Sequence, residues 1–501
     1  MDKNVKLRLN FDAYKDKVYA CWIGKNIGGT MGGPFEGTHD ILDIKGYTTE
    51  ANVVLPNDDL DLQLVWLHAV ESIGARAVNA NTLGEFWLSF LPPHWNEYGV
   101  GKVNMKRGLI PPLAGDYHND WKHSNGAWIR TEVWACMAPA APAIAAKYSI
   151  EDAKVDHGAG EGTYAAAFVA AMQSAAFVQS DLRRCIDIGL DFIPQDCRMA
   201  DSVRFAIECY EKGVPAMEAR NLILERNMDI GNGWFEAPSN VAYAILGLLY
   251  GEGDFKKSMI TAINCGDDTD CTAATVGATF GILHGMAGIP KDWMDHIGDD
   301  IVTISIDRGG VARQLPTTCT ELTKRVVAQA PHMLFENDAL VGFTDGETKL
   351  TDDLNAVLCG KQFAKEKEKL AVLKPNTMHF DFTFASVDVT LDDEADIAPN
   401  GERRVKVTLS NNVKVYDNAY YTLTFRWWLP EGFTVEGGKQ TMILNRHCRH
   451  NAPGETISTR TPSVEFTLKA GERVAPSNRC VLEIVGEGRI TPMYIPIVLL
   501  G

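Results

Sequence analysis

The sequence predicts a multi-domain chain, with a large all-α domain followed by a C-terminal immunoglobulin-like β-sandwich. Apolar residues recur at helical spacing in segments up to about residue 287, whereas beyond Pro375 they alternate with a period of two. A charged stretch separates the two patterns, and 501 residues are too many for one ordinary core. We expect an all-α domain over residues 1–360, a charged linker over 361–375 and a β-sandwich over 376–501.

The first helix is predicted over residues 12–26, with Asp12 as its N-cap and an apolar face that includes Trp22. It runs into Gly28–Gly37, a segment rich in glycine. Glycine tolerates backbone conformations and close approaches that other residues do not, so this loop is either a site of close contact or a plain turn between helices.

The remaining helices follow from the same periodicity. A second helix over residues 56–72 opens with proline and acids, which suit a helix N-terminus. Residues 96–125 predict a long irregular segment, which is usually functional in a compact domain. Further helices are predicted over residues 127–146, 162–179, 181–193, 199–212, 215–227, 238–250, 254–264 and 272–287. In the last, Gly277, Gly281 and Gly285 are four residues apart, which lets a neighbouring backbone approach.

Beyond the linker, short runs alternate between apolar and polar residues. Strands are predicted over residues 379–384, 404–409, 421–425 and 464–468, separated by turn residues such as Pro430–Gly432. Roughly 125 residues of this pattern match an immunoglobulin-sized sandwich.

The composition limits the function classes. Hydrophobic residues make up 46% of the chain and charged residues 23%, which is typical of a globular protein. A net charge of −17 argues against nucleic-acid or anionic-membrane partners. The first residues lack the apolar core of a signal peptide, and the apolar run at 272–290 is typical of a buried helix. Eleven scattered cysteines without a C-x-x-C pair predict a reducing, cytoplasmic location.

Two short acidic segments carry the candidate chemistry. Asp267, Asp268 and Asp270 lie together just before an apolar run, and Asn57-Asp58-Asp59 forms a similar acidic segment two hundred residues earlier. If the segments converge, each pair of like charges repels by roughly 1–4 kcal/mol, so cations or protons are needed. Carboxylate oxygens suit a hard ion such as Mg²⁺, with Mn²⁺ or Ca²⁺ as options. Alternatively, each segment only caps its own helix.

Several motifs resemble those of the ADP-ribosylglycohydrolase family, in the family's order. The run from Gly266 to Ala274 resembles its G-G-D-T-D-T signature, and Asn57-Asp58-Asp59 resembles its T-D-D motif. The segment from Gly28 to Glu36 resembles the family's first loop. Ser124-Asn125-Gly126-Ala127-x-x-Arg130 is similar to its G-N-G-A-x-x-R loop, and Asp156-His157 to its T-H step. The resemblance covers about residues 12–300 and leaves the sandwich outside.

The resemblance implies an all-α fold with one or two magnesium ions, which grip ribose hydroxyls while the bond at the anomeric carbon is hydrolysed. It implies that Asp58, Asp59 and Asp270 hold one ion, that Asp268 and Asp270 hold the other, and that Asp270 bridges. Glu36 becomes the candidate acid/base, with Asp268 and Asp270 also catalytic; a solvated loop glutamate is the alternative for Glu36.

Two departures concern the metal ligands. Asn57 and Cys271 stand where the family has threonines, so we place both among the candidate ligands. An amide still offers a hard oxygen, but a thiol is a poor Mg²⁺ ligand. Asp267 adds an acid where the family has glycine, and Ser124 replaces the glycine before Asn125. These changes weaken the case for the usual substrate more than the case for hydrolysis.

Six residues are predicted to bind substrate. Glu161 offers a second carboxylate, unless it caps a helix, and Arg130 offers a contact to phosphate, unless it is ordinary surface charge. The full set is Ser124, Asn125, Gly126, Arg130, His157 and Glu161.

These observations predict a metal-dependent glycohydrolase acting on a ribose-like sugar, most simply in ADP-ribosylated protein or an ADP-ribose derivative. An O-glycosidase of carbohydrate furanosides and a catalytically inactive binding protein are the alternatives. The expected partner is a small-molecule or protein-linked sugar, without nucleic acid or membrane. The sequence does not indicate an oligomeric state.

Overall fold

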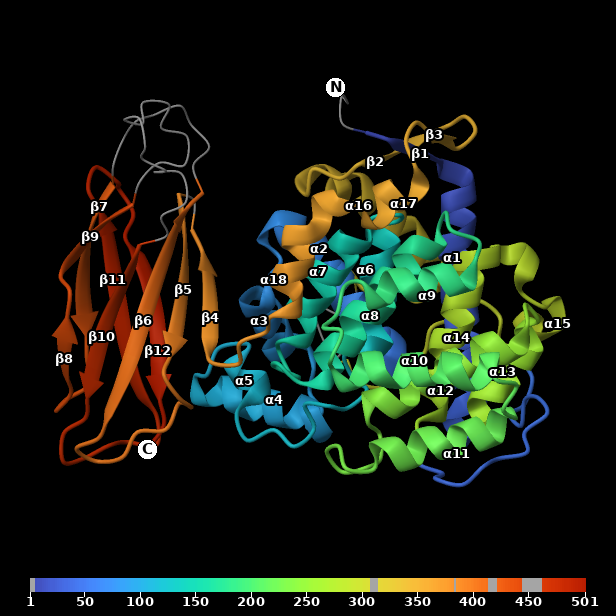
Figure 1. Ribbon diagram of the computed structural model, residues 1–501, viewed down its shortest axis with the longest axis horizontal. Helices are drawn as coiled ribbons and strands as arrows, with labels where there is room; N and C mark the ends of the chain where they lie inside the picture. Colours follow the sequence, from blue (N-terminus) through green and yellow to red (C-terminus); the bar gives the residue numbers. More distant parts are fainter. Residues whose placement is uncertain (1–4, 307–313, 383, 413–420, 444–461) are drawn as a thin grey trace. The chain divides into compact units, whose positions relative to one another are not determined.

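A computed structural model describes residues 5–306, 314–382, 384–412, 421–443 and 462–501. The chain divides into two compact units. The first consists of the chain up to Lys102 together with His118–Leu373, and the second of Val103–Tyr117 together with Lys374–Gly501. The first unit is helical and the second is built from antiparallel sheets, so the predicted fold class is confirmed (Figure 1).

The first unit is built around two antiparallel helices, α1 (Phe11–Gly32) and α14 (Thr269–His284), which lie side by side (Figure 1). Their backbones touch at glycines. A Cβ added to Gly277 would lie 2.0 Å from the Gly24 carbonyl oxygen, and one added to Gly32 would lie 2.3 Å from the Thr269 carbonyl oxygen. Side chains at these positions would force the helices apart. The glycines therefore set the register in which the end of α1 meets the start of α14.

Gly281 also belongs to this contact, because a Cβ there would lie 2.3 Å from the Ala20 carbonyl oxygen. Gly285 differs from the prediction. It is the C-cap of α14, with φ of 66°, and lies beyond the helix that was expected to run to residue 287. Glycine suits this position because L side chains rarely adopt a positive φ.

The other helices surround this pair. They are α2 (Asp58–Ile73), α3 (Ala80–Phe90), α6 (Glu132–Met137), α7 (Pro142–Ala153), α8 (Glu161–Ala176), α9 (Leu182–Leu190), α10 (Arg198–Glu211), α11 (Ala216–Asn227), α12 (Ala237–Gly251), α13 (Phe255–Asn264), α15 (Lys291–Ile297), α16 (Cys319–Glu336), α17 (Leu354–Cys359) and α18 (Ala364–Ala371). A small sheet adds to them: β1 (Leu7–Asn10) pairs in parallel with β2 (Val341–Thr344) and antiparallel with β3 (Lys349–Leu350).

Further sequence expectations about helices were wrong. The first helix has Asn10 rather than Asp12 as its N-cap, and it continues to Gly32 rather than ending at residue 26. The segment 96–125 is not irregular throughout, because it contains α4 (Asn96–Arg107) and α5 (Leu113–Asp116). The predicted helix 127–146 is divided into a 3₁₀ turn at Trp128–Arg130, α6 and the start of α7. Pro142 lies at the first turn of α7, where its missing N–H costs nothing, but a continuous helix could not accommodate it.

The second unit contains two antiparallel sheets, as in a β-sandwich. Their strand orders are β4-β5-β6-β10-β8 and β12-β11-β7-β9. The strands are β4 (Thr377–Asp381), β5 (Ala385–Leu391), β6 (Glu402–Asn411), β7 (Tyr421–Trp428), β8 (Thr434–Gly437), β9 (Gln440–Ile443), β10 (Ser463–Lys469), β11 (Asn478–Gly486) and β12 (Met493–Leu499). In β5, Val387, Val389 and Leu391 are buried and alternate with more exposed residues, so one face of the strand forms core.

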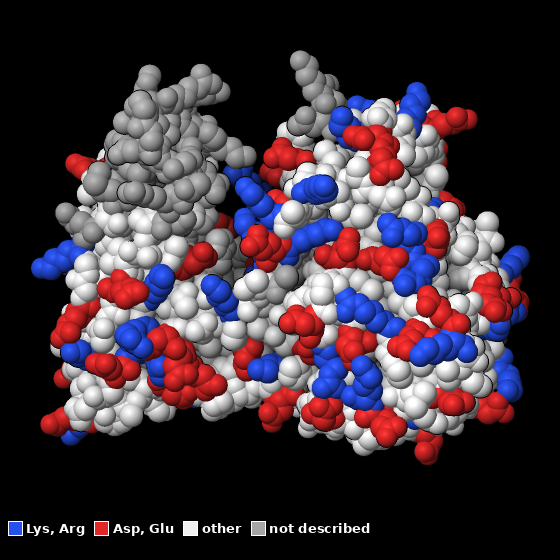
Figure 2. Space-filling model, in the orientation of Figure 1, with Lys and Arg blue, Asp and Glu red and all other residues white. Residues whose placement is uncertain are grey.

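On the face drawn in Figure 2, acidic and basic side chains are interspersed over the helical unit, and neither sign of charge dominates. Within the described residues, no helix is both long and apolar enough to cross a membrane. Every cysteine in the described part of the chain is a free thiol.

Candidate metal centre

Three chain segments bring the acidic residues together. The N-terminus of α2 supplies Asp58 and Asp59, and the N-terminus of α14 supplies Asp268 as N-cap and Asp270 in the first turn. Glu36 follows α1, whose last residue lies against Thr269 and Asp270. Backbone hydrogen bonds from Gly37 N–H to the Asp267 carbonyl (2.9 Å) and from Asp267 N–H to the Thr38 carbonyl (2.7 Å) join the two loops.

The acids form two clusters that share Asp270. Potential ligand atoms of Asp59, Asp270 and Cys271 lie within 4.8 Å of one another, and so do those of Glu36, Asp268 and Asp270. Both carboxylate oxygens of Asp59 and one oxygen each of Asp268 and Asp270 are buried without a hydrogen-bond partner among the described residues. Buried acceptors of this kind are costly unless something positive binds them.

The electrostatics point the same way. Burial and the neighbouring acids raise the pKa of Asp59 and Asp270 well above the ordinary value, although Lys25 lowers that of Asp59. Burial, with Asp268 and Asp58, raises the pKa of Glu36 to about 7. The clusters therefore hold more negative than positive charge, and their hard oxygen donors fit a divalent cation such as Mg²⁺, Mn²⁺ or Ca²⁺.

Cys271 fits such an ion less well. Burial and the surrounding aspartates raise the pKa of its thiol well above the usual value, so the thiol keeps its proton. A protonated thiol is a poor ligand for a hard cation. Asn57 is the N-cap of α2, where its Oδ1 accepts a hydrogen bond from Asp59 N–H at 2.7 Å.

Two charged neighbours have structural partners. Lys25 is buried and its Nζ lies 3.2 Å from Glu132, so it supplies one positive charge beside Asp59. Asp61, the last acid of its segment, accepts hydrogen bonds from Ile304 N–H (2.7 Å), Ser305 N–H and the Ser305 hydroxyl (2.9 Å). Asp61 therefore holds the 304–305 segment.

A cavity of about 790 Å³ opens onto the clusters. Five of its lining residues are acids: Glu36, Asp58, Glu97, Asp268 and Asp270. None of the described residues that line it is a lysine or arginine. Aromatic side chains form part of the wall, namely Trp95, Tyr98 and Phe235. The cavity is therefore strongly acidic, and it combines carboxylates with surfaces on which a sugar or base could stack.

The Ser124-Asn125-Gly126 loop lines the same cavity. Asn125 Nδ2 donates to Asp268 Oδ2 at 2.6 Å, and its Oδ1 accepts from Trp128 Nε1 at 2.9 Å. These two bonds fix the amide and orient the Asp268 carboxylate.

Three of the six predicted substrate-binding residues are not among the residues that line the cavity. Arg130 is completely buried, with Nε 2.9 Å from Asp152 and Nη2 2.7 Å from Asp156, so the surface-charge alternative was wrong. His157 lies behind Ser124, with Nε2 3.3 Å from the hydroxyl. Glu161 accepts hydrogen bonds from Arg198 N–H and Met199 N–H and so caps α10.

The acid that departs from the family signature is also accounted for. Asp267 accepts hydrogen bonds from Phe235 N–H at 3.2 Å and from Asn240 Nδ2 at 2.9 Å. These bonds tie the loop before α12 to the loop before α14.

Sequence reasoning missed Glu97, Trp95 and Phe235. The only signal for Glu97 was the clustering of polar and aromatic residues in the segment predicted to be irregular and functional, and Trp95 directly precedes that segment. Phe235 precedes a helix N-terminus and nothing in the local pattern marks it.

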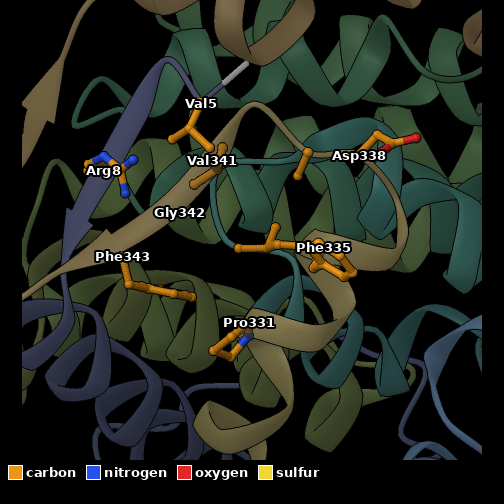
Figure 3. Close-up of a pocket in the computed structure, with 10 residues that line it drawn as sticks. Val5, Arg8, Pro331, Phe335, Asp338, Val341, Gly342 and Phe343 are labelled. Carbon is orange, nitrogen blue, oxygen red and sulfur yellow. The ribbon is translucent and has the colours of Figure 1, made fainter. Parts of the chain in front are cut away.

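A separate cavity of about 470 Å³ lies beside β1, β2 and α16 (Figure 3). Its ten lining residues include only two charged ones, Arg8 and Asp338, and are otherwise apolar or glycine. It offers no set of metal ligands.

Comparison with known proteins adds the family. Residues 10–327 match the ADP-ribosylglycohydrolase family. A stretch of 54 residues is 37% identical to the ADP-ribosylarginine hydrolase Tri1 of Serratia proteamaculans (strain 568); it spans 11% of this chain and 15% of that relative.

Solved structures give weaker likenesses. One titled ADP-ribosylglycohydrolase-related protein complex aligns with 64% of this chain and 99% of its own, at 18% identity and a TM-score of 0.41. A FixG-related protein from Vibrio parahaemolyticus aligns with 24% of this chain and 97% of its own, at 7% identity and a TM-score of 0.18.

Proposed function

The chain belongs to the ADP-ribosylglycohydrolase family, and on this premise we propose that it is a divalent-metal-dependent hydrolase of a ribose-like glycoside. The bond cleaved is the one at the anomeric carbon. The observation that carries the proposal is the pair of carboxylate clusters that share Asp270 at the floor of one cavity. The leading substrates are ADP-ribosylated protein and ADP-ribose derivatives, in keeping with the family.

The proposed metal ligands are Asp58, Asp59, Asp268 and Asp270, with Asn57 and Cys271 as weaker candidates. One or two Mg²⁺ or Mn²⁺ ions bound there would orient the ribose hydroxyls, acidify a water and offset charge in the transition state. The residues of the chain supply the rest. Asn125 holds Asp268 in place, and Lys25 provides fixed positive charge beside Asp59.

Glu36 is the proposed general base. Its carboxyl lines the cavity beside Asp268 and Asp270 and the residue is exposed, so it can reach a water at the anomeric carbon. It would take a proton from that water as the oxygen adds to the sugar. General acid–base catalysis contributes about 10²–10⁴-fold to a rate, which sets the expected loss for Glu36→Gln.

A second substrate class is favoured by the lining of the cavity. ADP-ribose carries a diphosphate, and diphosphate sites usually contain Arg, Lys or a helix N-terminus free of acids. The described cavity lining has five acids and no Lys or Arg. A neutral furanoside of a carbohydrate avoids this conflict. An inactive binding protein is the third alternative, and the retention of all four aspartates argues against it.

Thermal unfolding with Mg²⁺, Mn²⁺ and Ca²⁺, with and without ADP-ribose, tests the proposal. A metal at one hundred times its Kd should stabilise the fold by about 2.7 kcal/mol. Asp268→Asn should lose this response, whereas the exposed Asp295→Asn should keep it. Stabilisation by metal but not by ADP-ribose would favour the carbohydrate class, and hydrolysis of aryl furanosides would then decide.

Turnover completes the test. Glu36→Gln should still bind metal and lose hydrolysis. If no metal stabilises the wild-type protein and no glycoside is cleaved, the enzymatic proposal is wrong and the inactive alternative stands.

A further inference from the structure

A second buried carboxyl, Glu97, faces the cavity away from the metal ligands. It lies in the first turn of α4, is only 6% exposed and lines the cavity that Glu36 also lines. A Cβ added to Gly126 would lie 2.1 Å from Glu97 Oε1, so the carboxyl occupies the space that this glycine leaves free. Its other oxygen, Oε2, is buried without a hydrogen-bond partner among the described residues.

Glu97 ends a chain of buried polar contacts. Ser124 hydrogen-bonds to its carboxyl, and the Ser124 hydroxyl lies 3.3 Å from His157 Nε2. On the far side of the ring, His157 Nδ1 lies 2.9 Å from Asp156 Oδ1. Arg130 in turn donates to both oxygens of Asp156, at 3.0 and 2.7 Å. Asp156, His157 and Arg130 are completely buried, and Ser124 nearly so.

This arrangement connects a fixed ion pair to a carboxyl at the cavity wall. Asp156, held by Arg130, lies against the imidazole, and the imidazole lies against the Ser124 hydroxyl that hydrogen-bonds to Glu97. A buried carboxyl oxygen without a partner is costly unless it carries a proton or meets a ligand. Glu97 leaves one oxygen unpaired, next to the space that substrate would fill.

The protonation of Glu97 suits proton donation. Burial raises its pKa to about 7, with Asp156 adding to the rise and His157 and Ser124 opposing it. A fraction of the carboxyl therefore carries a proton at neutral pH, as a general acid requires.

The two carboxyls face substrate from different parts of the wall. Glu36 belongs to the cluster with Asp268 and Asp270, whereas Glu97 belongs to a separate cluster with Asp156 and His157. Consecutive residues connect to the two clusters, since Asn125 contacts Asp268 and Ser124 contacts His157. Paired carboxyls in separate positions are what glycoside hydrolysis by acid and base uses.

We propose that Glu97 is the general acid, which protonates the leaving group while Glu36 acts as base. The inference rests on the proposed glycosidic hydrolysis. As the bond between the anomeric carbon and the leaving atom breaks, its electron pair stays with the leaving atom, which takes the proton of Glu97. Water adds to the anomeric carbon and its proton passes to Glu36. Glu36 then loses this proton to solvent, and Glu97 regains one from solvent in the cavity that it lines.

The test compares substrates that differ only in the leaving group. The 4-nitrophenyl and methyl glycosides of ribofuranose and of ADP-ribose are offered to the metal-loaded enzyme. Nitrophenolate leaves without a proton, whereas an aliphatic alcohol needs one. Glu97→Gln should therefore lose about 10²–10³-fold in kcat/KM on the methyl glycoside and less than tenfold on the nitrophenyl glycoside.

Three further variants keep the result interpretable. Glu97→Asp retains a carboxyl and should recover part of the methyl glycoside activity. Ser124→Ala removes the hydroxyl that orients the Glu97 carboxyl, and it should also slow the methyl glycoside more than the nitrophenyl glycoside. Glu85→Gln alters an exposed glutamate that does not line the cavity, and it should leave the ratio of the two rates unchanged.

Equal losses on both glycosides in Glu97→Gln would overturn the inference while leaving the proposed hydrolysis intact. A wild-type enzyme that cleaves none of the four glycosides would overturn the proposed function and this inference together. If Glu97→Gln does not fold, Glu97→Asp is used for the comparison. A loss by the same factor, relative to wild type, on both glycosides would then refute the role of Glu97 as general acid.

Discussion

The close packing of α1 and α14 predicts that Gly277→Ala destabilises the helical unit. Its Cβ would lie 2.0 Å from the carbonyl oxygen and 2.5 Å from the carbonyl carbon of Gly24. Backbone atoms cannot rotate away, so the helices must separate by at least about 1 Å. Overpacking of this kind costs about 1–3 kcal/mol, and the better helix propensity of alanine returns about 1 kcal/mol. We expect a net loss near the upper end, about 2 kcal/mol.

Urea unfolding followed by circular dichroism measures this loss. Gly46→Ala is the matched control, because a Cβ there has nothing within 4 Å and its φ lies outside the left-handed region. Gly277→Ala should also bind Mn²⁺ more weakly in calorimetry, because α1 leads to Glu36 and Asp268 is the N-cap of α14. If Gly277→Ala unfolds at the same urea concentration as wild type and Gly46→Ala, the argument from backbone contact is refuted.

Three other predictions concern the site and its support. Cys271→Ser should raise the affinity for Mg²⁺ on the order of tenfold and lower the affinity for Cd²⁺, because a hydroxyl replaces a protonated thiol. Calorimetry with both metals measures the two affinities. A change of both affinities in the same direction would contradict the prediction. Asp156→Asn should lower the free energy of unfolding in urea at pH 7 by about 3–5 kcal/mol, because it removes one of the negative charges that pair with buried Arg130. Burial raises the pKa of Asp156, but Arg130 and His157 outweigh it and hold the pKa below the ordinary value. The stabilisation by the ionised Asp156 carboxylate is therefore present above pH 4 and is lost as the pH falls through the folded-state pKa. The difference in the free energy of unfolding between wild type and Asp156→Asn should accordingly become smaller toward pH 3.

Periodicity was enough to predict the helices and the sandwich, because helical and strand repeats are local properties. Its failures came where a distant partner decides the outcome. The helix α1 continues to Gly32, although its four glycines would weaken an isolated helix. Gly24, Gly28 and Gly32 lie against α14, and Gly29 lies against the Asn57 side chain. Segment 96–107 lacks a clear apolar stripe, so its helix could not be expected from sequence spacing.

The candidate site divides in the same way. The convergence of Asp58, Asp59, Asp268 and Asp270 was predicted through the family's ordered motifs, since spacing alone favoured helix capping. Arg130 was expected to meet phosphate or solvent, because no local pattern reveals two buried aspartates as its partners. Glu97 became visible only when folding placed it against Gly126.

The assignment of Val103–Tyr117 to the second unit has a practical consequence for dissecting the protein. The chain passes between the units three times, after Lys102, Tyr117 and Leu373. Within the second unit, the Ser477 hydroxyl donates to the Arg107 carbonyl at 2.8 Å, and Tyr117 donates to Asp396 at 2.6 Å. A truncation at residue 373 would therefore leave a segment whose partners have been removed, among them the acceptor of the Tyr117 hydroxyl. To express the helical unit alone, residues 103–117 should be replaced with a short linker.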